Sequence, residues 1–283
     1  MNSQIISLAN WLGSPPGKYM LDWEHEQFDR AVSDIFGYHA LQLGFSELQA
    51  LRANRMPHQW LALHDTQENN KPDLTASPET QQLSDSVSHA RATSSHPRAA
   101  LITDPGALPF PAASLDLVVL AHTLELSRDP HATLREVERV LVPEGRVVIT
   151  GLNPASLWGM RQRRVHLYKR MGLDDGFLPE AGEFIGYWRL RDWLRLLSFE
   201  VESARFGCYR PALTSQKWLA RFDWMDQAGS RWWPIFGAVY FVVAVKRVRG
   251  MRLLEPAWKL RKVSAARPSV VANREARSSR DIT

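Results

Sequence analysis

Apolar and polar positions follow two different periods along the chain. Short, mostly apolar runs bounded by turn residues predict strands, and apolar residues at three- and four-residue spacing predict amphipathic helices. The expected strands cover residues 39–44, 58–65, 99–103, 114–122, 146–152, 200–207 and 237–247. The expected helices lie within residues 19–37, 45–55, 129–141 and 187–199. Because strands and helices alternate, the pattern predicts an α/β fold with parallel strands and right-handed crossovers.

The clearest local signals lie between residues 114 and 141. The strand at 114–122 is nearly all apolar after Asp116, which is typical of a strand covered on both faces. The helix that follows opens with Asp129, a good N-cap residue, and with Pro130, which suits the first turn.

Composition divides the chain into segments. Residues 1–37 are expected to form an N-terminal helical segment, and residues 38–250 the main domain. Residues 66–98 are rich in Ser, Thr, Gln and Pro and predict a loosely held polar insertion. Residues 251–283 are expected to be a disordered basic tail.

Charge is concentrated near the C-terminus. Residues 246–283 hold 11 Lys and Arg against 3 Asp and Glu, a balance of +8, which leaves 24 basic and 27 acidic residues elsewhere. Such a tail can contact RNA, DNA or anionic lipid, or it can be solvated without a fixed partner. A nucleic-acid partner is not favoured, and the oligomeric state is not indicated.

Several classes of protein are disfavoured. The N-terminus lacks the pattern of a signal peptide, and the longest apolar run, 232–245, is shorter than the roughly 20 residues that span a bilayer. The single Cys208 forms no internal disulfide and suits a reducing cytoplasm. The nine His residues show no zinc-ligand spacing, so no metal is expected. Four tryptophans are expected to build the core or cover a pocket rather than stack on bases: Trp188, Trp193, Trp232 and Trp233.

One segment carries a dense motif. Its elements, in order, are Asp104, Leu108-Pro109-Phe110, Leu115-Asp116, Glu136 to Leu141, and Pro143 with Gly145. In residue type and spacing this segment resembles the class I S-adenosylmethionine-dependent methyltransferases of type 11, which include ubiquinone and menaquinone C-methyltransferases. The resemblance implies a seven-stranded, doubly wound, mostly parallel sheet with an antiparallel last strand. It also implies that S-adenosylmethionine lies across the carboxyl ends of the strands.

The resemblance also implies a set of site residues. The family turn D-x-G-x-G-x-G falls on Gln42 to Leu48, where Gly44 is the one glycine retained and Gln42 replaces the carboxylate. Asp65 is the candidate for the ribose hydroxyls, although a surface role at the start of the insertion explains it equally well. Asp104 is the candidate for the adenine amino group, in preference to a plain Asx-turn.

His122, just past the fourth strand, is a candidate cofactor contact and catalytic base, or a pocket-lining residue bonded to backbone.

Three functions therefore stay open. The first is methyl transfer to a small-molecule acceptor whose identity the sequence does not indicate. The second is a binding or scaffold protein that has lost the cofactor, which the missing glycines favour. The third is a methyltransferase directed to RNA or protein by the basic tail.

Overall fold

The structure is a computed structural model that describes residues 11–45, 47–64, 100–169, 178 and 184–248. The predicted insertion at 66–98 and tail at 251–283 lie outside these residues. All described residues belong to one compact unit, which ends at Val248. The domain boundaries expected from composition stay a prediction.

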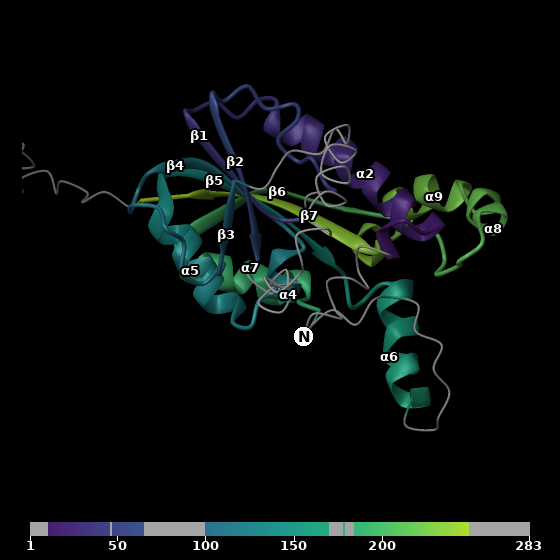
Figure 1. The fold of residues 1–283 in the computed structure, drawn as a ribbon. Helices are drawn as coiled ribbons and strands as arrows, with labels where there is room; N and C mark the ends of the chain where they lie inside the picture. Colours follow the sequence, from purple (N-terminus) through teal and green to yellow (C-terminus); the bar gives the residue numbers. More distant parts are fainter. Residues whose placement is uncertain (1–10, 46, 65–99, 170–177, 179–183, 249–283) are drawn as a thin grey trace, which may run out of the picture. The chain divides into compact units, whose positions relative to one another are not determined.

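A single seven-stranded sheet forms the centre of this unit (Figure 1). Its strand order is β3 (Leu101–Thr103), β2 (His58–His64), β1 (His39–Gly44), β4 (Leu115–Ala121), β5 (Leu141–Leu152), β7 (Val239–Lys246) and β6 (Phe199–Gly207). The neighbours from β3 to β5 are parallel, and β7 is antiparallel to both β5 and β6. The predicted mostly parallel α/β fold with an antiparallel last strand is confirmed.

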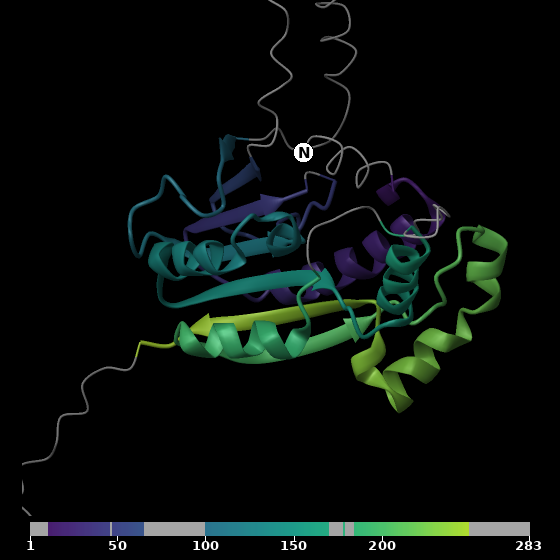
Figure 2. The same cartoon turned by 90° about the horizontal axis from the view of Figure 1, so that it is seen from below.

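Helices cover both faces of the sheet (Figures 1 and 2). On one face lies α2 (Pro15–Val32), and on the other lie α4 (Thr123–Leu126), α5 (Pro130–Val140) and α7 (Tyr187–Leu196). The strands alternate between two core clusters: Leu117 and Val119 of β4 belong to the cluster that holds α2, whereas Val118 and Leu120 belong to the cluster that holds α5 and α7. A strand buried on both faces explains why this run is almost wholly apolar.

The predicted start of α5 is confirmed. The Asp129 side chain accepts hydrogen bonds from the backbone N–H groups of His131 and Ala132, at 2.9 and 3.0 Å, and Pro130 occupies the first helical position. These bonds satisfy two of the amide groups that a helix leaves without internal partners at its N-terminus.

The segments that the sequence pattern left irregular also form helices. These are α6 (Leu157–Lys169), α8 (Gln216–Arg221), α9 (Trp224–Trp232) and the short 3-10 helix η2 (Pro234–Phe236). No helix within the described ranges is long and apolar enough to cross a membrane.

The prediction of a helix over residues 45–55 is wrong. The described part of this segment consists of turns, although Phe45, Leu48 and Leu51 are buried as the helical pattern required. Backbone bonds from Ala50 N–H to the Leu48 carbonyl and from Asn54 N–H to the Leu51 carbonyl join residues too close in sequence for an α-helix.

Candidate functional site

The predicted site residues lie at the carboxyl ends of neighbouring parallel strands. Gly44 ends β1 and is paired with Ala121, the last residue of β4, so Gly44 and His122 are brought together. Asp104 follows the last residue of β3, which lies two strands away from β1. Asp65, expected at the end of β2, lies outside the described residues.

Gly44 occupies a position that requires glycine. Its φ angle is +113°, and a Cβ atom there would lie 2.3 Å from the Ala121 carbonyl oxygen. The neighbouring Thr123 hydroxyl donates a hydrogen bond of 2.8 Å to the Leu43 carbonyl. The end of β1 is therefore fixed against the end of β4 by close backbone contact and one buried hydroxyl.

This hydroxyl gives a test with a matched control. Thr123→Val is expected to lower the free energy of unfolding by about 1 kcal/mol, because it leaves the Leu43 carbonyl without that donor. Thr150→Val should be neutral or stabilising, because the buried Thr150 hydroxyl has no hydrogen-bond partner among the described residues. Urea unfolding of both variants measures the difference, and equal effects would contradict the assignment.

The side chain of Gln42 closes the turn that follows Gly44. Its Nε2 donates to the carbonyl of Phe45 at 2.8 Å and to the carbonyl of Leu48, and its Oε1 accepts from the Ala50 N–H at 3.0 Å. A carboxylate in this position could not donate to the two carbonyls. The amide at Gln42 therefore fits the non-helical loop, which explains the departure from the family turn.

His122 lies between two buried carboxylates. Its Nε2 is 2.7 Å from Glu24 Oε1 of α2, and its Nδ1 is 3.1 Å from Glu125 Oε2 of α4. Burial disfavours the charged ring, but the two carboxylates outweigh it and raise the pKa of His122 from 6.5 to about 10. The ring is therefore protonated at neutral pH, with a hydrogen on each nitrogen.

The two carboxylates differ in their other contacts. Glu125 Oε1 accepts a hydrogen bond from the backbone N–H of Leu152, whereas Glu24 Oε2 is buried without a partner among the described residues. Two carboxylates and one imidazolium leave this cluster with a formal charge of −1. Within the described part of the chain, no group of three or more His, Cys, Asp or Glu residues is arranged to hold a metal ion.

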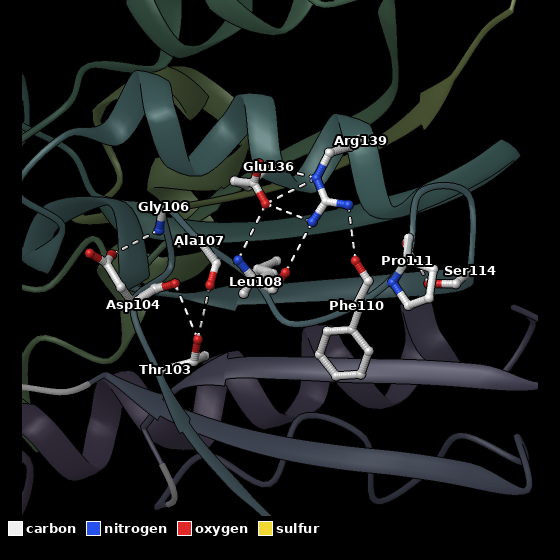
Figure 3. A network of polar contacts seen from close by, with 10 residues as sticks. All are labelled: Thr103, Asp104, Gly106, Ala107, Leu108, Phe110, Pro111, Ser114, Glu136 and Arg139. Carbon is white, nitrogen blue, oxygen red and sulfur yellow. Dashed lines mark hydrogen bonds and ion pairs between the residues drawn. The ribbon is translucent and has the colours of Figure 1, made fainter.

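Asp104 lies in an exposed turn after β3 (Figure 3). Its Oδ1 accepts a hydrogen bond of 2.9 Å from the Gly106 N–H, which is an Asx-turn. The Thr103 hydroxyl donates to the Ala107 carbonyl at 3.2 Å across the same turn. The turn holds the carboxylate in place at the strand end, and a contact between Asp104 and adenine stays a prediction.

The family motif after Asp104 is explained by a clamp on the backbone (Figure 3). Arg139 donates to the carbonyls of Phe110 and Leu108 at 2.9 and 3.0 Å, and Glu136 accepts from the Leu108 N–H at 3.2 Å. The hydrogen bonds from Arg139 hold the pKa of Glu136 below its ordinary value. Glu136 and Arg139 therefore fix the turn that presents Asp104.

Sequence reasoning missed Glu24. It lies 98 residues before His122 on a helix whose apolar face was the only visible signal. The one available indication was that Glu24 falls on the apolar side of this helix. A charged residue is rarely buried unless it is paired, so its position indicated a buried partner.

A separate cavity of about 590 Å³ lies between α2 and α8. Its lining includes Lys18, Tyr19, Trp23 and Arg210, and none of the predicted site residues. Arg210 is already engaged by the carboxylates of Asp223 and Asp226. The cavity is therefore distinct from the strand ends.

Comparison with known proteins agrees with this architecture. Residues 79–149 match the methyltransferase domain family. An uncharacterized Escherichia coli protein, YafS, is 33% identical over 178 residues, which are 62% of this chain and 65% of the length of YafS. A chain from the complex of the Haloferax volcanii Trm112 methyltransferase activator with a candidate methyltransferase shares the fold, with a TM-score of 0.51 and 17% identity over 88% of this chain and 99% of the other. The family match falls on the segment whose motif resembles the type 11 methyltransferases, and the fold is that of solved methyltransferase structures.

Proposed function

We propose that the protein binds S-adenosylmethionine and transfers its methyl group to a small-molecule acceptor. The observation that carries the proposal is the meeting of Gly44 and His122 at the carboxyl ends of β1 and β4, with Asp104 after β3. The strand order reverses between β1 and β4, because β2 and β3 follow on one side of β1 whereas β4 and β5 lie on the other side. In doubly wound sheets, ligands bind at the carboxyl ends of the strands where the strand order reverses.

The charge of the site supports a cationic ligand. Glu24 Oε2 is buried without a partner among the described residues, in a cluster whose formal charge is −1. A buried carboxylate oxygen is stabilised by a nearby positive charge. The sulfonium group of S-adenosylmethionine is positively charged and supplies a methyl group that is already electrophilic.

Three of the five predicted contacts have a proposed part at this site. Gly44 allows the chain to turn at the strand end, and Asp104 offers a carboxylate to the adenine amino group. His122 connects α2 to the end of β4 through Glu24. A base role for His122 is not part of this proposal, because a base needs a free lone pair and both nitrogens of an imidazolium carry hydrogens.

Calorimetric titration with S-adenosylmethionine and S-adenosylhomocysteine tests the proposal. The unaltered protein is expected to bind both, and Asp104→Ala to bind about tenfold more weakly, since hydrogen bonds to a charged group are lost. Asp34→Ala, which removes an exposed carboxylate beside α2, is the matched control and should leave the affinity unchanged. An unaltered affinity in Asp104→Ala removes that residue from the site.

A second candidate is a binding or scaffold protein that retains the fold without the cofactor. It is favoured by the closed turn after Gly44. In this turn the Ala50 N–H already donates to the Gln42 side chain. The Phe45 ring is buried, and its centroid lies 6.1 Å from that of the His122 ring. If neither ligand gives heat at millimolar concentration or shifts the melting temperature, the second candidate replaces the first.

A further inference from the structure

The segment that contains α8, α9 and η2 exposes an unusual number of large apolar side chains. They are Trp218, Trp224, Trp232, Trp233, Ile235 and Phe236, with exposed fractions between 43% and 75%. Trp188, Trp232 and Trp233 were expected in the core or over a pocket, and the core position is wrong because all three are exposed. Monomeric proteins rarely expose contiguous apolar surface of this kind unless it contacts a partner or a membrane.

The exposed face of α9 is aromatic and basic. Trp224, Arg231 and Trp232 stand at positions i, i+7 and i+8, which fall on one side of a helix. All three residues are exposed. In an ordinary surface helix the apolar stripe faces the core, so α9 presents the opposite arrangement.

The inner face of α9 is held by small and polar residues instead. Gly229 packs so closely against the Tyr209 ring that a Cβ atom would lie 2.3 Å from it. The Asp226 carboxylate accepts hydrogen bonds from the Tyr209 N–H at 3.1 Å and from Arg210 Nε at 2.9 Å, and also from the Tyr19 hydroxyl. These contacts fix the helix to the fold while the tryptophans stay outside.

The basic and acidic side chains of this segment also differ in their surroundings. Lys217, Arg221 and Arg231 are exposed, whereas the two acidic residues, Asp223 and Asp226, are both paired with Arg210. In Figures 1 and 2, α8 and α9 lie beside the N-terminal half of α2, at one end of the sheet. The exposed side chains therefore combine uncompensated positive charge with indole rings.

We propose that the surface formed by residues 216–236 docks on a lipid bilayer that contains anionic lipid. Indole rings favour the boundary between headgroups and acyl chains, where the ring is buried and its N–H stays hydrated. The basic side chains meet the negative surface of the leaflet. An acidic protein surface would match the same charge, and tryptophan also anchors protein interfaces, so the vesicle measurement is the test that separates the two partners.

Co-sedimentation of the full chain with vesicles tests the proposal. The unaltered protein should pellet with vesicles of phosphatidylcholine and phosphatidylglycerol, and less with phosphatidylcholine alone. The double variant Trp224→Ser, Trp232→Ser should partition at least about tenfold more weakly, because two apolar anchors are lost. Trp188→Ser is the matched control, since Trp188 is 57% exposed on α7, outside this surface.

The basic tail is present in all of these proteins, so its attraction to the vesicles is the same in each. Equal partitioning of the double variant and the unaltered protein would overturn the proposal and assign the binding to the tail. Self-association that the double variant abolishes, together with no binding to either vesicle, would also overturn it in favour of a second copy of the chain. Sedimentation equilibrium measures that association, and unchanged melting of the variants shows that they fold.

Discussion

Replacing His122 with glutamine is expected to lower the free energy of unfolding by about 3–5 kcal/mol, because it removes the cation between two buried carboxylates. Glu24 and Glu125 are both almost wholly buried, and each is within 3.1 Å of the imidazole ring. Without the ring, their charges face each other in a region that water does not reach. Urea unfolding followed by circular dichroism measures the loss. His58→Gln, at an exposed position on β2, is the matched control and should change the stability by less than about 0.5 kcal/mol.

The same substitution should change how stability depends on pH. The folded protein holds the pKa of His122 at about 10, above the ordinary 6.5 of the unfolded chain. The stabilisation from the ring is therefore complete below pH 6.5 and is lost as the pH rises through 10. The difference in stability between the unaltered protein and His122→Gln should shrink over that interval. A difference that stays constant from pH 6 to 10 would contradict the buried imidazolium.

Replacing Gln42 with leucine is expected to lower the free energy of unfolding by about 2–4 kcal/mol, because it removes three buried hydrogen bonds. The Phe45 carbonyl loses its donor, and the Leu48 carbonyl and Ala50 N–H keep only the bond to each other. The leucine keeps most of the side-chain volume but cannot bond the Phe45 and Leu48 carbonyls or the Ala50 N–H. Amide hydrogen exchange should report faster opening of residues 45–51 in the variant, and urea unfolding should give the total cost.

Gln59→Leu provides a matched control for Gln42→Leu. Gln59 Nε2 donates to the Asn54 and Met56 carbonyls at 3.0 and 3.3 Å, but the side chain is only partly buried, so water can replace it. We expect a loss of about 1 kcal/mol. If Gln42→Leu were no more harmful than Gln59→Leu, the loop after β1 would not depend on Gln42.

The sheet could be predicted from the sequence because its strands are short, apolar and separated by strong turn and cap residues. The strand β4 and the start of α5 at Asp129 are the clearest cases. The segment at 45–55 could not be predicted, because its helical apolar spacing is overridden by the side chain of Gln42. That side chain offers the backbone a set of partners that competes with helical bonds, and no periodicity reveals such a contact.

The strand-end positions of the site could also be predicted. Chain order alone places residues such as Gly44 and His122 at the same edge of a parallel sheet. The contact between Glu24 and His122 depends on how α2 packs, and it joins residues that no local pattern relates. The motif residues Glu136 and Arg139 were visible as a family signature. Their contacts with the Leu108 backbone could not be predicted, because they join residues 28 and 31 positions apart in the chain.

The position of β7 has a consequence for the order of folding. It is the last strand along the chain, yet it lies between β5 and β6 and pairs with both. Until Val239–Lys246 leave the ribosome, β5 and β6 each present an unpaired edge that invites wrong pairing with other chains. Because β6 pairs only with β7, it can join the sheet only after β7 has paired with β5.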